Sequence, residues 1–113
     1  MIRVPLMPLP DQRLRIILGG QDVSLRVYTR GKPEGIYTDL DVSGTDVWRG
    51  FIARNLVPCK LYPYLPFAGQ LVFVDMQGLE DPRWEGLGSR WLCMYLTDAE
   101  AAGIFPERNV RRI

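Results

Sequence analysis

Apolar and polar residues alternate along two stretches of the chain, residues 23–30 and 36–42. In the first stretch, Val23, Leu25 and Val27 share one face, whereas serine, arginine and tyrosine occupy the other. A period of two is typical of β-strands that bury one face. Because turn-forming residues separate the two stretches, we predict that they pair as an antiparallel hairpin.

A longer hairpin is predicted over residues 69–96. Its two apolar runs, Gln70–Met76 and Arg90–Leu96, have the length of buried strands and are rich in β-branched or aromatic residues. The connection between them contains residues that favour turns, namely Gly78, Asp81, Pro82, Gly86 and Gly88. We therefore expect two strands in the middle of the core, joined by a long loop.

Shorter elements complete the pattern. Arg13–Leu18 is a strand candidate that ends at a pair of glycines suited to a tight turn, and Ser43–Asp46 is a second turn. Val47–Val57 favours a strand with a bulge at Gly50, although some of its residues also have helical spacing. Two prolines make Lys60–Phe67 an extended connector rather than a strand within a ladder.

The two ends of the chain differ in character. Three prolines in residues 1–10 exclude a helix and a central strand, which predicts an extended arm or a sheet edge. Residues 97–103 predict one or two helical turns, capped by Thr97 or Asp98 and ended by Gly103. The tail at residues 104–113 is either loose or a contact for an acidic partner through its three arginines, Arg108, Arg111 and Arg112.

Together these elements predict one β-rich domain over residues 1–113. The expected fold is all-β, a small antiparallel barrel or sandwich with one short C-terminal helix. A chain of this length can bury a substantial core. Apolar residues make up 47% of the chain and charged residues 24%, a balance typical of a folded protein rather than a disordered one.

Charge and hydropathy argue against several partners. A net charge of +1 does not favour a surface dedicated to nucleic acid or to an anionic membrane. No apolar run approaches the roughly 18 residues of a membrane span. The first residues lack the apolar core and cleavage site of a signal peptide.

The sequence contains no histidine, which excludes histidine-based triads, metal clusters and proton shuttles. Cys59 and Cys93 each lie in an apolar run, so we predict two buried, reduced thiols of a protein made in a cytosol. The alternative is a disulfide between them, which the sequence does not exclude. Two cysteines alone make a poor metal site. We therefore expect no catalytic residue, cofactor or metal.

Charged residues on the outer face of the first hairpin are of opposite sign. Arg26 and Arg30 lie on one strand, and Asp39 and Asp41 on the other, which predicts cross-strand ion pairs worth some tenths of a kcal/mol each. An active site built on the two aspartates is the alternative. It is not favoured, because a solvated sheet face does not shift a carboxyl pKa as acid–base catalysis requires.

The loop Gly78–Ser89 is longer than a hairpin needs, and long ordered loops are usually functional. It carries Arg83, Trp84 and Glu85, which have no evident role in forming the fold. Flanking charges place this segment near the surface, where a tryptophan is the type of residue that anchors an interface. We predict an interaction surface with Trp84 as anchor, with the alternative that Trp84 covers the protein's own core.

Two rival functions remain at this point. One is a hydrolase that uses Asp75 or the neighbouring Glu80 and Asp81, although an aspartate beside a glycine-rich turn more often caps that turn. The other is a β-barrel that binds single-stranded nucleic acid by stacking bases on Tyr28 and Tyr37 between arginines. The near-neutral charge of the chain does not favour the second.

Three segments together carry a family resemblance. Leu25–Tyr28, Ile36–Leu40 and above all the block Gly69–Leu96 resemble the small baseplate plug proteins of contractile-tailed bacteriophages. The likeness covers about Leu14–Leu96, so residues 1–10 and the basic tail are not informative for it.

This resemblance implies a β-rich structural protein at the axis of the tail baseplate, which helps to close the hub or tube until ejection. It implies a place in the virion, after synthesis in the host bacterial cytoplasm. Its expected partners are other baseplate hub, spike and tail-tube proteins, with several copies in a symmetric particle. The family carries no catalytic or metal residues to transfer, so an enzyme is not expected; a hydrolase accessory to the tail is the alternative.

Overall fold

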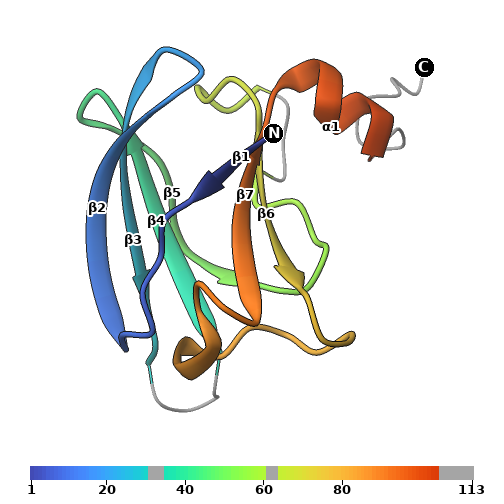
Figure 1. Cartoon of the computed structure of the whole chain (residues 1–113). Helices are drawn as coiled ribbons and strands as arrows, with labels where there is room; N and C mark the ends of the chain where they lie inside the picture. The colour runs from blue at the N-terminus through green and yellow to red at the C-terminus, as the bar shows by residue number, and fades with distance from the viewer. Residues whose placement is uncertain (31–34, 61–63, 105–113) are drawn as a thin grey trace.

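The computed structural model describes residues 1–30, 35–60 and 64–104. Most of this part of the chain is β-structure, arranged as two antiparallel sheets with one short helix beside them (Figure 1). In chain order the elements are β1 (Ile2–Val4), β2 (Asp11–Leu18), β3 (Gln21–Tyr28), β4 (Ile36–Val42), β5 (Thr45–Ala53), β6 (Gln70–Asp75), the 3-10 turn η1 (Trp84–Gly86), β7 (Trp91–Leu96) and α1 (Asp98–Ile104).

The larger sheet is a meander of four strands in the order β2-β3-β4-β5. The pairing of β3 with β4, from Val23↔Val42 to Tyr28↔Tyr37, confirms the first predicted hairpin. Two-residue turns join β2 to β3 and β4 to β5, and both residues of each turn have positive φ, as a right-handed twist requires. The second turn is therefore shorter than the predicted Ser43–Asp46, and β5 already begins at Thr45.

The predicted bulge at Gly50 is present in β5. Thr38 faces Phe51 and Leu40 faces Trp48, so the single residue Asp39 lies opposite both Arg49 and Gly50. Gly50 adopts a φ of 63°, which an L-residue adopts only at a cost. The strand ends at Ala53 rather than Val57, because the following residues leave the larger sheet and bond to β6.

The smaller sheet has the order β1-β7-β6. The antiparallel pairing of β6 with β7, from Gln70↔Leu96 to Asp75↔Trp91, confirms the second predicted hairpin. The N-terminal segment supplies β1, an edge strand that pairs with β7 from Ile2↔Tyr95 to Val4↔Cys93. On the other edge, residues 55–59 cover β6, since the amides of Leu56 and Cys59 donate to the carbonyls of Phe73 and Leu71, each at 2.8 Å.

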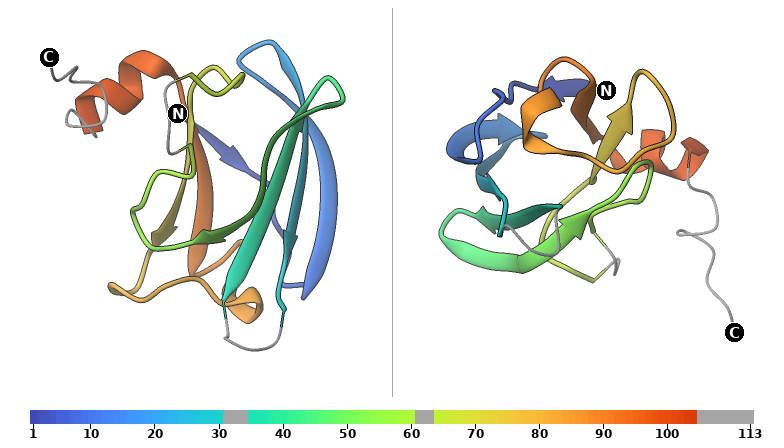
Figure 2. Two further views of the ribbon diagram at one scale, coloured as in Figure 1. Left: turned by 180° about the vertical axis from the view of Figure 1, so that it is seen from behind. Right: turned by 90° about the horizontal axis from the view of Figure 1, so that it is seen from below.

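The main core lies between the two sheets (Figure 2). Alternating residues of both sheets fill it, among them Val23, Leu25, Val27, Leu40, Leu71, Phe73, Cys93 and Tyr95. Phe67, from the connector before β6, joins the two sides through edge-on contacts with the rings of Trp48 and Tyr95. The predicted fold class, all-β with one short C-terminal helix, is confirmed.

Helix α1 covers part of the outer face of the smaller sheet, where Ala101 packs against Val72 and Leu96. Thr97 caps it as predicted, because its hydroxyl accepts the Glu100 amide at 3.2 Å while the Glu100 carboxylate accepts the Thr97 amide at 3.0 Å. The helix includes Gly103 and ends one residue later. Within the described ranges, no helix is long and apolar enough to cross a membrane.

Both thiols are free and buried in the core, which confirms the prediction for Cys59 and Cys93. Burial removes the hydration that a thiolate needs and raises the pKa of Cys59 to about 12. The pKa of Cys93 is raised for the same reason, with a further contribution from Cys59 nearby. Neither group is therefore a nucleophile at neutral pH.

Candidate assembly surface

The loop between β6 and β7 is organised around the buried carboxylate of Asp75. Its two oxygens accept both Nε and Nη2 of Arg90 at 2.9 Å, and the amides of Gln77 and Glu80 at 2.9 Å each. The Arg90 guanidinium, helped by the two amides, holds the pKa of Asp75 far below its usual range. The carboxylate is thus fully engaged in ordering the loop, as an aspartate beside a turn was expected to be.

Arg90 extends this cluster to the rest of the loop. Its Nη2 donates to the Glu80 carboxylate at 2.7 Å, and its guanidinium lies over the Trp91 ring at 4.4 Å from the centroid. The Trp91 indole donates to the Glu80 carbonyl at 3.1 Å, while Arg83 covers the same ring at 5.0 Å. The connection is therefore folded back onto the end of the smaller sheet rather than extended into solvent.

The adjacent acids Glu80 and Asp81 are held apart by different partners. Glu80 binds Arg90, whereas Asp81 accepts the amide of Asn55 at 3.0 Å and the guanidinium of Arg54 at 3.3 Å. Asn55 in turn accepts the amide of Asp75 at 2.8 Å through its side chain. These acids thus tie the loop to the segment after β5, and they do not form the pair that the hydrolase hypothesis required.

The three loop residues predicted to make contacts lie at η1. Arg83 and Glu85 are exposed, and Trp84 between them is partly buried against the main core. The indole thus covers the core on one side and remains accessible on the other, which combines features of both interpretations of Trp84. The predicted contacts Arg108, Arg111 and Arg112 lie outside the described residues.

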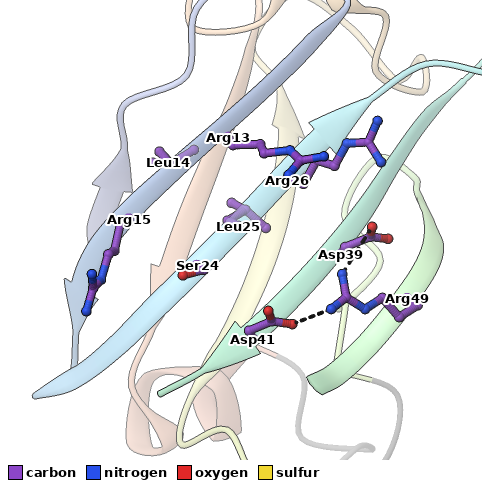
Figure 3. Close-up of a pocket in the computed structure, with 9 residues that line it drawn as sticks. All are labelled: Arg13, Leu14, Arg15, Ser24, Leu25, Arg26, Asp39, Asp41 and Arg49. Carbon is purple, nitrogen blue, oxygen red and sulfur yellow. Dashed lines mark hydrogen bonds and ion pairs between the residues drawn. The ribbon is translucent and has the colours of Figure 1, made fainter. Parts of the chain in front are cut away.

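The outer face of the larger sheet carries a hollow of about 410 Å³ that is lined by four arginines and two aspartates (Figure 3). Its residues come from β2 to β5: Arg13, Leu14, Arg15, Ser24, Leu25, Arg26, Asp39, Asp41 and Arg49. Most of its charges are already paired, since Arg15 binds Asp22 at 2.8 Å and Arg26 binds Asp11 at 2.8 Å. Most charged side chains of the hollow are therefore engaged in ion pairs within the protein.

The predicted ion pairs of Arg26 and Arg30 with Asp39 and Asp41 are wrong in their partners. The bulge in β5 places Arg49 opposite Asp39, and this guanidinium reaches Asp39 at 3.5 Å and Asp41 at 3.0 Å (Figure 3). Arg26 turns to the neighbouring strand and Asp11 instead. An extra residue in one strand changes which side chains meet, which alternation alone does not show.

The face around Asp39 is also less solvated than the sequence analysis assumed. Asp39 is buried and accepts the Tyr28 hydroxyl at 3.0 Å and the Gly50 amide at 2.7 Å. At Asp41, loss of hydration and the neighbouring Asp46 carboxyl raise the pKa, while Arg49 opposes both. Asp39 and Asp41 thus both bind the guanidinium of Arg49, and they do not form a separate acid–base pair.

Tyr28 and Tyr37 do not offer an open stacking surface. Their rings stack on each other at 6.0 Å, and each is less than a tenth exposed. Arg26 covers Tyr28 at 4.1 Å from the ring centroid, and Arg30 covers Tyr37 at 4.6 Å. A base would have to displace these cation–π contacts before it could stack, so the geometry does not support the nucleic-acid hypothesis.

The described residues hold no group of three or more acidic, cysteine or histidine side chains arranged for a metal ion. The fold and the loop together define a small β-protein whose charged groups order its own strands and turns. The family described as cyanophage baseplate Pam3 plug gp18 matches residues 1–98, and the chain belongs to this family of baseplate plug proteins. No curated protein matches the chain.

The protein is therefore a structural component of a phage tail baseplate, located in the virion tail and associated with other baseplate proteins. The match confirms the predicted family, and it extends through the N-terminal residues that the resemblance left out. Sequence analysis missed the part played by Asn55 and Leu56, between β5 and β6. The only local signal was an Asn-Leu pair shortly before Pro58, which does not distinguish a buried link from an ordinary loop.

Proposed function

We propose that this protein closes the central hub or tube of the baseplate until ejection, held there by contacts of the loop Gly78–Ser89. The observation that carries the proposal is the Asp75–Arg90 pair, which fixes the path of a long surface loop. A loop that is already ordered loses little conformational entropy when a partner binds, so it suits a permanent structural contact.

Within this loop, Arg83, Trp84 and Glu85 contact neighbouring hub, spike or tail-tube proteins. Support comes from the exposure of the two charged side chains and from the accessible side of the indole between them. An aromatic side chain flanked by polar ones is the usual composition of an interface anchor and its rim. The arginines Arg108, Arg111 and Arg112 add a contact with an acidic surface.

The chain acts as one domain over residues 1–113, in which residues 1–10 supply the edge strand β1 and residues 104–113 form a tail, and several copies occupy a symmetric baseplate. Synthesis in the host bacterial cytoplasm fits the two reduced thiols. The function requires no catalysis or cofactor. The acids considered for catalysis are occupied: Asp75 by Arg90, Glu80 and Asp81 by separate partners, and Asp39 and Asp41 by Arg49.

A paired comparison of variants tests the loop contact. The double variant Arg83→Ala/Glu85→Ala removes one cation and one anion from the loop, and Arg15→Ala/Asp22→Ala removes a similar pair from the outer face of the larger sheet. Both should melt within a few degrees of the parent, because the ion pairs that they remove, Arg83–Glu80 and Arg15–Asp22, lie at the surface, where such pairs contribute little. Only the loop variant should be depleted from purified particles, and normal incorporation of it would contradict the proposed contact.

Electron-microscopy averages of tails with and without the protein test the plugging role. The difference between the two should lie on the axis of the baseplate, at the end of the tube. A difference confined to the periphery of the baseplate would contradict the proposed closure, even if the loop variants behave as expected.

A further inference from the structure

Strand β2 forms a free edge of the larger sheet. Among the described residues it pairs with β3 alone, and Figure 1 shows it as the outermost strand of that sheet. Its eight residues contain no proline, and their pairing with β3 runs without a bulge. The opposite edge, β5, has two register shifts, which are a usual protection of an edge against further pairing. Within this sheet, β2 is therefore the edge that suits an added strand.

The register shows which backbone groups of β2 face the free edge. Thr29 donates its amide to the Pro10 carbonyl at 2.9 Å across the β2–β3 pair, so the hydrogen-bonded pairs fall on the even-numbered residues of β2. The amides and carbonyls of the odd-numbered residues point away from β3. No hydrogen bond between described residues reaches these groups. They belong to Asp11, Arg13, Arg15 and Ile17.

The inner face of β2 is also incompletely covered. Leu14 and Ile16 point towards the core but are only partly buried, whereas their neighbours Leu25 and Val23 on β3 are fully buried. The core between the sheets therefore thins out at β2. A further strand beside β2 would shield these two apolar side chains as well as bond to the free backbone groups.

On the outer face, Arg13 lacks a partner for its charge. It lies directly opposite Arg26, and like charges in that position repel each other (Figure 3). Asp11 binds Arg26 at 2.8 Å and Asp22 binds Arg15 at 2.8 Å, whereas Arg13 makes no ion pair or hydrogen bond with any described residue. The side of Arg13 away from Arg26 is the free edge. An acidic residue on an added strand would lie there and complete the pair.

A second copy of the chain does not supply this acid from its described edge strands. In an antiparallel pairing of two β2 strands, each register that includes Arg13 and pairs more than half of the strand sets one arginine opposite another. A parallel pairing about a two-fold axis brings the uncharged inner residues of β2 beside Arg13. Strand β1 contains no acid, and the one acid of β5, Asp46, is bound to Arg49.

We propose that the free edge of β2 binds an extended segment of a different polypeptide as an added strand, with an acidic residue of that segment opposite Arg13. Main-chain hydrogen bonds to the odd-numbered residues supply the attachment, and Arg13 selects an acidic sequence. Arg15 takes no part in this selection, because Asp22 already neutralises it. The proposal goes beyond the contact of the loop Gly78–Ser89 and shares no residue with it.

One pair of variants tests the backbone contact. Arg15→Pro and Arg15→Ala lose the same side chain, but proline also removes the amide hydrogen that points to the free edge. Both full-length proteins should melt at similar temperatures, because an edge strand tolerates proline where its amide faces solvent. Arg15→Ala should enter particles normally, and Arg15→Pro should be depleted about tenfold, since the partner's carbonyl loses its donor.

Charge variants test the recognition of the acid and do not depend on how the proline variant folds. Arg13→Glu should not lower the melting temperature, because it replaces a like-charge pair with Arg26 by an opposite one. Its incorporation into particles should fall about tenfold, whereas Arg13→Lys keeps the charge and should be incorporated. Normal incorporation of Arg13→Glu would overturn the proposal, as would equal incorporation of folded Arg15→Pro and Arg15→Ala.

A photo-crosslinking amino acid at position 17, introduced into the full-length protein during infection, identifies the occupant. Ile17 is 63% exposed and lies at the free edge, two positions from Arg15. We expect an adduct with a different polypeptide, and exchange of its acid near the crosslink for lysine should restore incorporation of Arg13→Glu. An adduct with a second copy of this chain, no adduct, or no restoration would overturn the proposal. Normal incorporation of Arg83→Ala/Glu85→Ala, by contrast, contradicts only the loop contact.

Discussion

Arg90 binds Asp75 through two parallel hydrogen bonds of 2.9 Å, and this pair closes the connection between β6 and β7. Because the pKa of Asp75 is lowered in the folded state, its ionised form stabilises the fold above the ordinary carboxyl pKa near 4. That contribution is lost as the pH falls below about 4 towards the lowered value. The parent protein should therefore lose stability steeply in acid.

The variant Asp75→Asn should be less stable than the parent at pH 7, and should lose less of its remaining stability between about pH 4 and pH 2. Urea midpoints measured across this range check both parts. Glu85→Gln, an exposed acid in the same loop, is the control and should keep the parent midpoint at pH 7. Parallel pH profiles for parent and Asp75→Asn would show that the pair does not stabilise the fold.

Trp84→Ala should destabilise the isolated protein by about 2 kcal/mol. Full burial of a tryptophan makes its removal cost roughly 3–5 kcal/mol, and this indole contacts the core with only part of its surface. Chemical denaturation measures the loss, with the fully buried Leu87→Ala as a reference for a complete core deletion of roughly 2–5 kcal/mol. No measurable loss would mean that Trp84 serves only contacts with partners.

Alanine substitutions at two glycines with positive φ, Gly44 and Gly69, distinguish the cost of backbone strain from the cost of a steric clash. Gly44, with a φ of 82°, has open space around the position of a Cβ, so Gly44→Ala should cost about 1 kcal/mol for the backbone alone. Gly69 has a φ of 96°, and a Cβ there would lie 2.5 Å from the Leu96 carbonyl oxygen. Gly69→Ala should be much more destabilising in the same denaturation assay, and equal costs would contradict the close approach.

Cys59 and Cys93 should resist thiol reagents in the native protein. Both are buried, and the raised pKa of Cys59, about 12, leaves almost no thiolate at pH 8. Titration with a chromogenic disulfide should detect no thiol in native protein within minutes and two per chain in denaturant. Fast labelling of native protein would indicate that the core opens near residues 59 and 93.

The pattern of alternation predicted most of the sheet structure because local rules govern it. In the hairpin of residues 23–30 and 36–42, only a short connection separates the two strands. Every second residue of the first strand, such as Val23 and Leu25, is apolar and points into the core. Gly50 marked the bulge because a glycine within a strand has few other uses. Prolines limited the N-terminal segment to an arm or a sheet edge, and only the structure shows that it is an edge strand, because its partner, β7, lies at the far end of the chain.

Contacts that depend on register or on distant segments could not be predicted. Arg49 displaced the expected partners of Asp39 because the bulge added a residue to β5, and its effect on side-chain partners is visible only in three dimensions. Asn55 reaches Asp75 and Asp81 from a different part of the sequence. The candidate surface was therefore only partly foreseen: its loop was singled out from its length, while the attachment of the loop to Asn55 required the three-dimensional structure.

The smaller sheet joins residues from opposite ends of the chain, since Ile2 of β1 pairs with Tyr95 of β7. The four-stranded meander consists of neighbouring hairpins, whose short loops close quickly during folding. During synthesis on a ribosome, the meander can therefore form before β7, the partner strand of β1, has been made. The loop Gly78–Ser89 depends on the β6–β7 hairpin, so a truncated chain that ends before β7 lacks the loop through which we propose that the protein is held in the baseplate.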